Sequence, residues 1–124
     1  MNNPMPPEAV VQKQLDAYNA RDLDALLRIY ADDVQLFEHP ARLLASGTDE
    51  IRERFSLRFQ ELNLHARLSH RIVMGQIVVD HEQVTRTFPE GTGTIELVMI
   101  YEVRGDRIAR AWTLPGPRIL DSEP

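Results

Sequence analysis

Residues 77–103 read IVVDHEQVTRTFPEGTGTIELVMIYEV, and their pattern is the clearest indication of the fold class. Apolar and polar side chains alternate in each of its halves, which is the period-two pattern of β-strands. Residues 89–93, PEGTG, separate the halves with proline and glycine, the residues that favour turns. The stretch therefore predicts two long antiparallel strands joined by a short turn.

The residues on either side of this hairpin predict a larger sheet. Residues 64–74 also alternate, so that Leu68 and Ile72 face the core with His70 between them as a hydrogen-bonded core histidine. Residues 107–114 form a last strand, which Pro115 closes because proline cannot donate a ladder hydrogen bond. Short turns join these four strands, which predicts an antiparallel arrangement.

The N-terminal half has the 3.6-residue period of helices instead. The pattern predicts a first helix over residues 7–20 and a second that Asp22 caps and whose apolar stripe ends at Tyr30. A short strand follows over residues 34–37, and Thr48 then opens a third helix with its hydroxyl as the cap. The order of elements predicts an α+β fold, with three N-terminal helices packed on a mainly antiparallel sheet.

Length and composition limit the classes of function. A chain of 124 residues suits one domain, which we place at residues 8–116 between a leader, 1–7, and a C-terminal tail, 117–124. The net charge of -5 and a single lysine, Lys13, argue against a nucleic-acid partner. The chain has no cysteine, no signal-peptide pattern and no apolar run of about 18 residues. We therefore expect a cytoplasmic protein with no membrane partner.

Several N-terminal segments resemble a known family. They are VQ at 11–12, YNARDLDAL at 18–26, YADDV at 30–34 and GT…IRERF at 47–55. These segments resemble ketosteroid isomerases and SnoaL-like polyketide cyclases of the NTF2-like superfamily, over about residues 9–114. The resemblance implies a cone, in which a strongly curved sheet wraps around the helices and leaves a cavity, and a homodimer formed through the outer sheet face.

The same resemblance argues against steroid isomerisation. Those isomerases use a carboxylate base with a tyrosine and a protonated aspartic acid as hydrogen-bond donors. At the matching positions this chain has His39, Gln14 and Met99, so none of the three groups is retained. Because the loss of one such donor typically slows catalysis by about two to four orders of magnitude, we do not expect that activity.

Other residues are candidates for acid–base chemistry or ligand binding. His39 takes the position of the family's general base, and its side chain can move protons near neutral pH. Asp80 and His81 lie in an otherwise apolar strand beside Glu82, and alternation makes either the histidine or the two carboxylates line the cavity. No close-spaced set of metal ligands occurs, and we expect neither a metal nor a cofactor. The expected lining of the cavity is Gln14, Tyr18, Phe37, Phe55, Phe59, Met99, Tyr101 and Trp112.

Two functions remain open on these observations. One is an enzyme that transfers protons as an isomerase, cyclase or dehydratase on a small apolar metabolite, with His39, His81 or Asp80 in the reaction. The other is a pocket or interaction module without catalysis. In both cases Val98 and Ile100 form the apolar centre of a sheet face with charged ends, which predicts a homodimer contact.

Overall fold

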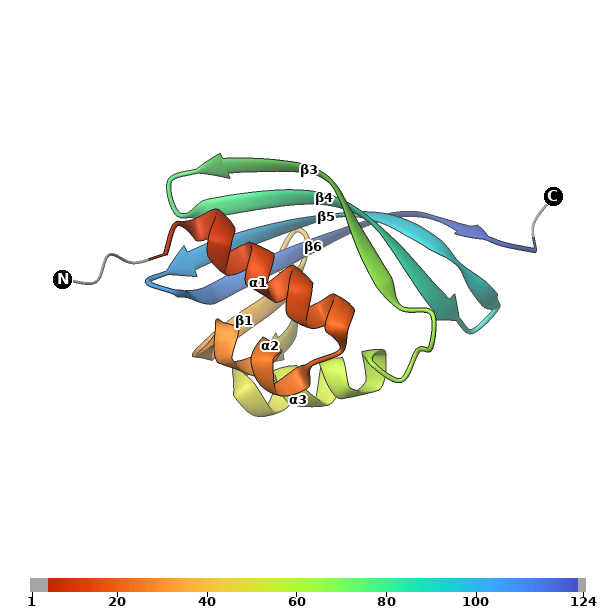
Figure 1. Cartoon of the computed structure of the whole chain (residues 1–124), viewed down its shortest axis with the longest axis horizontal. Coiled ribbons are helices and arrows are strands. Elements are labelled where there is room, and N and C mark those ends of the chain that lie inside the picture. The colour runs from red at the N-terminus through yellow and green to blue at the C-terminus, as the bar shows by residue number, and fades with distance from the viewer. Residues whose placement is uncertain (1–4, 123–124) are drawn as a thin grey trace.

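A computed structural model describes residues 5–122, and in this part of the chain three helices lie against the concave side of one six-stranded sheet (Figure 1). Residues 1–4 of the expected leader and 123–124 of the expected tail lie outside the described residues. The elements, in chain order, are α1 (Pro7–Ala20), α2 (Leu23–Ile29), β1 (Tyr30–Glu38), β2 (Arg42–Ser46), α3 (Gly47–Arg58), β3 (His65–Met74), β4 (Ile77–Phe88), β5 (Gly91–Arg104) and β6 (Arg107–Leu120).

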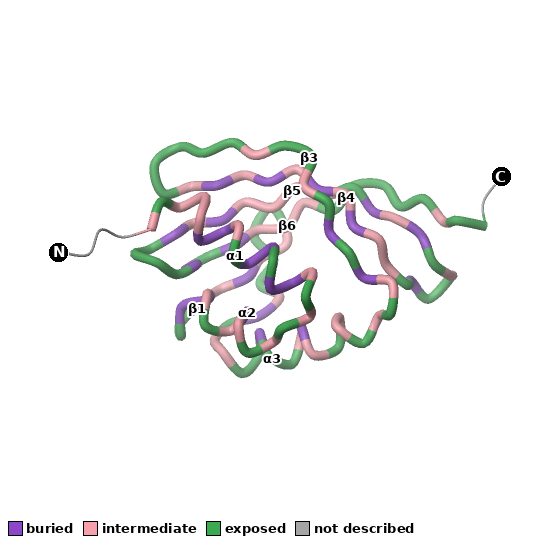
Figure 2. Tube along the Cα trace, in the orientation of Figure 1, coloured by how far each residue is buried: buried purple, intermediate pink, exposed green. Residues whose placement is uncertain are grey.

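The strands lie in the order β2-β1-β6-β5-β4-β3. Strands β3 to β6 form the expected antiparallel meander, and β1 pairs with β6 in parallel. The sheet curves strongly around α1, and α2 and α3 lie beside α1 on the same side (Figure 1). Figure 2 shows buried stretches on α1, β4, β5 and β6, whereas most of β3 is exposed. This arrangement confirms the predicted α+β cone of NTF2-like type.

The connection between the helices differs from the prediction at three points. Tyr30 begins β1 instead of ending α2, and the short strand β2, which pairs with the end of β1, was not predicted. Thr48 is not the cap of α3, because the helix begins at Gly47 and the Glu50 carboxylate accepts a hydrogen bond from the Ser46 N–H at 2.8 Å. The predicted cap of α2 is confirmed, since Asp22 accepts a bond from the Ala25 N–H at 3.1 Å.

A β-bulge in β3 reverses which side chains face the core. The register with β4 shifts between Leu68 and His70, so that Ser69 is the additional residue. Because one extra residue moves all later side chains to the opposite face, Ile72 is 63% exposed and Arg71 points inward. The expectation that His70 is a core histidine is therefore wrong: its side chain is exposed.

Strand β6 continues to Leu120 and does not end at Pro115. Its pairing with β1 ends at Thr113, so residues beyond that point form an edge of the sheet while they still pair with β5. Prolines are tolerated on such an edge because the missing N–H would have faced away from the neighbouring strand.

The C-terminal end of α1 fixes the start of β3. The Asn19 side chain donates to the Ala66 carbonyl at 2.9 Å and accepts from the Ala66 N–H at 2.8 Å. Arg21, the helix cap with φ 53°, donates to three carbonyls of the loop between α3 and β3, at 2.9–3.1 Å. These bonds hold one rim of the concave face in a defined position.

Candidate functional site

A cavity of about 90 Å³ lies between α1, α3 and the concave face of the sheet. Apolar side chains form more than half of its wall, and several polar side chains converge on it. This combination is typical of small-molecule sites. The lining residues are Gln14, Leu15, Tyr18, Tyr30, Leu36, Arg54, Phe55, Arg58, Ala66, Glu82, Val84, Leu97, Met99, Tyr101 and Thr113.

Glu82 is the acid of this cavity. It lies in β4 with only 5% of its surface exposed, and no described residue forms a hydrogen bond with its carboxylate. Every fully enclosed side-chain nitrogen or oxygen in residues 5–122 has a hydrogen-bond partner, so the Glu82 oxygens open onto the cavity. Burial, and secondly the charge of Asp80, raise the pKa of Glu82 to about 8. The group can therefore exchange a proton close to neutral pH.

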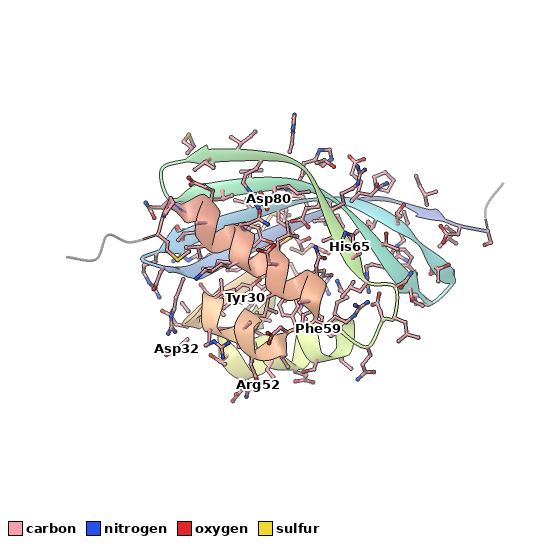
Figure 3. All side chains as sticks on the ribbon, in the orientation of Figure 1. Tyr30, Asp32, Arg52, Phe59, His65 and Asp80 are labelled. Atoms are coloured by element: carbon pink, nitrogen blue, oxygen red, sulfur yellow. The ribbon has the colours of Figure 1, made fainter. Side chains whose placement is uncertain are left out.

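Asp80 is two residues away on the same face of β4, but its carboxylate is fully paired. Arg71 of β3 binds it through two hydrogen bonds of 2.7 and 2.9 Å, and a third Arg71 nitrogen donates to the Gln12 side chain at 2.9 Å. Asp80, which is labelled in Figure 3, is completely buried, and it is not among the residues that line the cavity. Such a bidentate pair fixes both side chains and leaves neither free for proton transfer.

Gln14 joins two tyrosines in the wall of the cavity. The Tyr101 hydroxyl donates to its side-chain oxygen at 3.2 Å, and its nitrogen donates to the Tyr30 hydroxyl at 3.3 Å. Burial raises the pKa of both tyrosines, so both hydroxyls keep their protons. The Tyr30 oxygen accepts from Gln14 while no described residue accepts its proton, which leaves Tyr30 as a donor at the cavity.

The cavity-facing side of α3 carries two arginines, Arg54 and Arg58, with Phe55 between them. Arg58 lies 3.6 Å from the Glu61 carboxylate. Arg54 is half-buried and has no ion pair or hydrogen bond within residues 5–122. The wall of the cavity therefore includes a cation as well as an acid.

The histidines proposed from the sequence lie outside this cavity. His39 follows the end of β1 and is exposed. The His81 side chain points to the convex face of the sheet, is 42% exposed and lies 3.1 Å from Glu96. The sequence left open whether His81 or the two carboxylates of β4 face the cavity side. In the structure Asp80 and Glu82 face the concave side, together with Val78 and Val84.

Five of the eight side chains expected in the lining do line the cavity: Gln14, Tyr18, Phe55, Met99 and Tyr101. Phe59 lies one layer away, where its ring packs on Tyr18 at a centroid distance of 5.7 Å. Phe37 and Trp112 stack on each other at 5.7 Å on neighbouring strands and do not line it. The structure therefore separates an inner and an outer aromatic group, which residue type alone does not distinguish.

Three arginines at or beside the cavity were absent from the sequence-based site: Arg54, Arg58 and Arg71. Glu82 was considered only beside Asp80 and His81; the sequence puts it on the same face as Val78 and Val84 but does not show that this face is the concave one. Arg54 follows Ile51 by three residues and so lies beside the apolar stripe of its helix. Arg71 had no such signal, since its direction depends on the bulge at Ser69.

The described residues contain no group of three or more histidine and carboxylate side chains that could hold a metal ion. Within the same part of the chain, no helix combines the length and the apolar character needed to cross a bilayer.

Comparison with known proteins agrees with the fold described above. The model of the SnoaL-like domain matches residues 11–111, which is most of the chain. The chain belongs to the SnoaL-like family. No curated protein matches it significantly.

Solved structures similar to this SnoaL-like protein share its fold. An uncharacterized cystatin-fold protein from Novosphingobium aromaticivorans is 22% identical with a TM-score of 0.81, covering 89% of this chain and 98% of that one. An NTF2-like protein of unknown function from Cytophaga hutchinsonii is 11% identical with a TM-score of 0.75, covering 94% and 96%. A hypothetical protein with a ketosteroid isomerase-like fold from Catenulispora acidiphila, in complex with trimethylamine, is 15% identical with a TM-score of 0.72, covering 84% and 82%. At these identities the likeness concerns the fold alone.

Proposed function

We propose that this SnoaL-like protein is a proton-transfer enzyme for a small, largely apolar molecule, with Glu82 as the general base. One observation carries the proposal: a buried carboxylate without a hydrogen-bond partner among the described residues opens onto an apolar cavity, with its pKa raised to about 8. A base whose pKa lies near the working pH is deprotonated in a large fraction of the molecules and still accepts a proton readily. Isomerase, cyclase and dehydratase reactions all need such a step.

Tyr30 supplies the complementary donor in this proposal. Removal of a proton next to a carbonyl group places negative charge on the carbonyl oxygen, and a donor aimed at that oxygen stabilises the transition state. The Tyr30 hydroxyl lines the cavity, and the bond from Gln14 fixes its oxygen. Glu82 and Tyr30 would thus replace the base and donor that are missing from the family's steroid-isomerase positions.

The test uses a probe reaction that needs only a base. In a nitrobenzisoxazole, loss of the carbon-bound ring proton breaks the N–O bond and releases a coloured cyanophenolate. We expect the wild-type rate to rise with pH around a midpoint near 8, because only the deprotonated form of Glu82 accepts the proton. Glu82→Gln should lower the rate by about two orders of magnitude or more.

The matched control is Glu96→Gln, because Glu96 also lies in the sheet but is 61% exposed on the convex face. It should leave both the rate and the pH midpoint unchanged. If Glu82→Gln retains the wild-type rate while the probe still binds, Glu82 is not the base. A pocket that binds without catalysis would then be the better description of the protein.

We also propose a homodimer formed through the convex face of the sheet. Val98 and Ile100 are half-buried in the single chain, and the stacked Phe37 and Trp112 extend this apolar area along β1 and β6. Charged pairs stand at its margins, including Glu102 with Arg110 at 3.6 Å. An apolar centre with a polar rim suits a two-fold contact. Sedimentation should then give twice the 14.2 kDa mass of one chain. We propose the cytoplasm as the location of this protein.

A further inference from the structure

The cavity has a cationic wall that the proposed proton transfer does not use. Helix α3 places Arg54, Phe55 and Arg58 on the cavity: Arg58 comes three residues after Phe55 and four after Arg54, and residues at these spacings share one side of a helix. Two like charges four residues apart on a helix repel each other and destabilise it slightly. An anion between or beside them would remove that repulsion.

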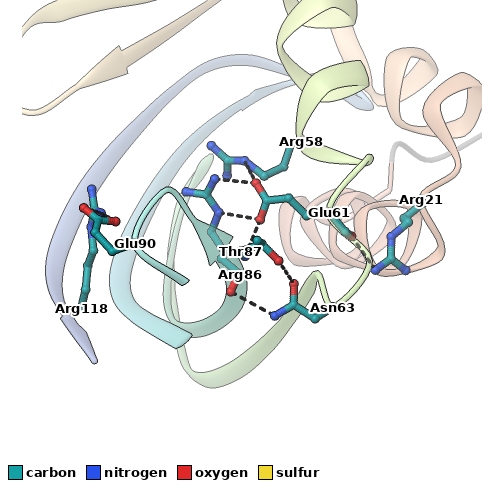
Figure 4. A network of polar contacts seen from close by, with 8 residues as sticks. All are labelled: Arg21, Arg58, Glu61, Asn63, Arg86, Thr87, Glu90 and Arg118. Atoms are coloured by element: carbon teal, nitrogen blue, oxygen red, sulfur yellow. Dashed lines mark hydrogen bonds and ion pairs between the residues drawn. The ribbon is translucent and has the colours of Figure 1, made fainter. Parts of the chain in front are cut away.

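The carboxylate beside Arg58, that of Glu61, is already engaged. Glu61 accepts two hydrogen bonds from Arg86, at 3.2 and 2.6 Å, and one from the Thr87 N–H at 2.9 Å (Figure 4). Arg58 lies 3.6 Å from the same carboxylate. The single negative charge of Glu61 is therefore already shared by two arginines, Arg86 and Arg58, and Arg54 is not one of its partners.

Arg54 itself has no such partner within residues 5–122. Burial is the main factor that lowers the pKa of its guanidinium, and the positive charges of Arg58 and Arg86 lower it further. Glu38 is close enough to act in the opposite direction, but its carboxylate pairs with Arg42 at 3.4 Å. A chain of net charge -5 thus concentrates positive charge at one part of its cavity wall.

We propose that the ligand of this cavity carries a carboxylate group, which Arg54 binds with Arg58 beside it, while its apolar part lies toward Phe55, Leu97 and Met99. A planar guanidinium binds a carboxylate through two charge-assisted hydrogen bonds, and these are stronger where water is scarce. The substrate class is accordingly an apolar carboxylic acid. This assignment rests on the proposed function for the choice of cavity, but not on Glu82 being the base.

The experiment compares two probes of nearly equal size, cyclohexanecarboxylate and cyclohexanecarboxamide, by calorimetric titration at pH 7. The wild type should bind the carboxylate at least about tenfold more tightly than the amide, because only the carboxylate forms an ion pair with Arg54. Arg54→Met, which keeps an unbranched side chain without charge, should remove this preference and leave the amide affinity nearly unchanged.

Arg52→Met is the matched control. Arg52 belongs to the same helix, has a side chain 54% exposed, and pairs with Asp49 at 3.5 Å away from the cavity (Figure 3). It should keep the full preference for the carboxylate. Equal binding of the two probes by the wild type, a preference that survives Arg54→Met, or an equal loss in Arg52→Met would each overturn the assignment.

The two proposals fail separately in this design. If the amide binds but the carboxylate is not preferred, the acid-binding role of Arg54 is wrong while Glu82 can still act as the base. If the carboxylate is preferred but Glu82→Gln turns over the nitrobenzisoxazole like the wild type, only the proton-transfer proposal is wrong. If the wild type binds neither probe, the assignment of Arg54 falls together with the choice of cavity.

Discussion

Two carboxylates two residues apart on the concave face of β4 have opposite surroundings. Asp80 is completely buried and receives two hydrogen bonds from Arg71, whereas Glu82 is almost as buried and receives none from the described residues. The Asp80 carboxylate is therefore held in an ion pair with Arg71, while the Glu82 carboxylate loses hydration without such a partner and favours the protonated form. The comparison shows that burial alone does not give a carboxylate its function; the presence of a partner does.

The largest effect should follow from breaking the ion pair between Asp80 and Arg71. Asp80→Asn removes the negative charge and leaves Arg71, whose side chain is only 16% exposed, without a counter-ion. We expect the free energy of unfolding to fall by about 3–5 kcal/mol. Urea denaturation at pH 7 measures this loss, and a change below about 1 kcal/mol would contradict the pairing.

The double variant Arg71→Met with Asp80→Leu serves as its control. Since both charges are then absent, stability should recover to near the wild-type value. In this variant the pKa of Glu82 loses the raising effect of Asp80 together with the smaller lowering effect of Arg71, so the midpoint of its titration should move below that of the wild type.

The second prediction concerns Glu82, the carboxylate without a partner among the described residues. Folded Glu82 keeps its proton up to about pH 8, while the unfolded chain loses it near 4.5. Unfolding therefore releases a proton between these values, so the free energy of unfolding falls as the pH rises through this window and is constant again above it. Within the window the decrease from this group alone should reach about 1.4 kcal/mol per pH unit.

Glu82→Gln should remove that pH dependence and make the protein more stable than the wild type at pH 8.5. Denaturation at several pH values from 4.5 to 8.5 measures the effect, with the exposed Glu96→Gln as the reference variant. Parallel curves for Glu82→Gln and the wild type would show that Glu82 does not titrate as stated.

The smallest effect on the single chain should come from the other face of the sheet. Ile100→Glu alters the convex face and reaches neither carboxylate, so the stability of the monomer should change by about 0.5 kcal/mol or less. Sedimentation should nevertheless shift from the dimer to the monomer of 14.2 kDa. Leu57→Glu, at a 64% exposed position of α3, should remain dimeric.

The sequence predicts the fold better than the site, and β4 shows why. Alternation is a property of the sequence itself, so it shows that Asp80 and Glu82 share a face and that His81 has the other. It does not show which face is concave, because Ile77 and Val79 are as apolar as Val78 and Val84. That choice depends on pairing with β3 and β5 and on the position of the helices.

Arg54 and Arg71 show a second limit of prediction from sequence. A charged residue on a helix or strand normally has its side chain in water, so the position of Arg54 beside the apolar stripe does not by itself predict a place in the cavity wall. Nothing in the local pattern distinguishes Arg71 from Arg67. Their roles arise from long-range geometry, the curvature of the sheet for Arg54 and the bulge for Arg71. Apart from the short strand β2, the predicted element order is confirmed, as are the capped second helix and the antiparallel meander, because all three depend on local chemistry.

The additional residue in β3 also has a consequence for how this protein can change during evolution. Residues before Ser69 and residues after it present opposite parities to the core. Deleting that single serine would turn one half of the strand over, so that either the guanidinium facing Asp80 or the apolar side chains of Ala66 and Leu68 would move to the solvent side. A change of the strand's length by one residue should therefore be more damaging than a substitution at one of its exposed positions.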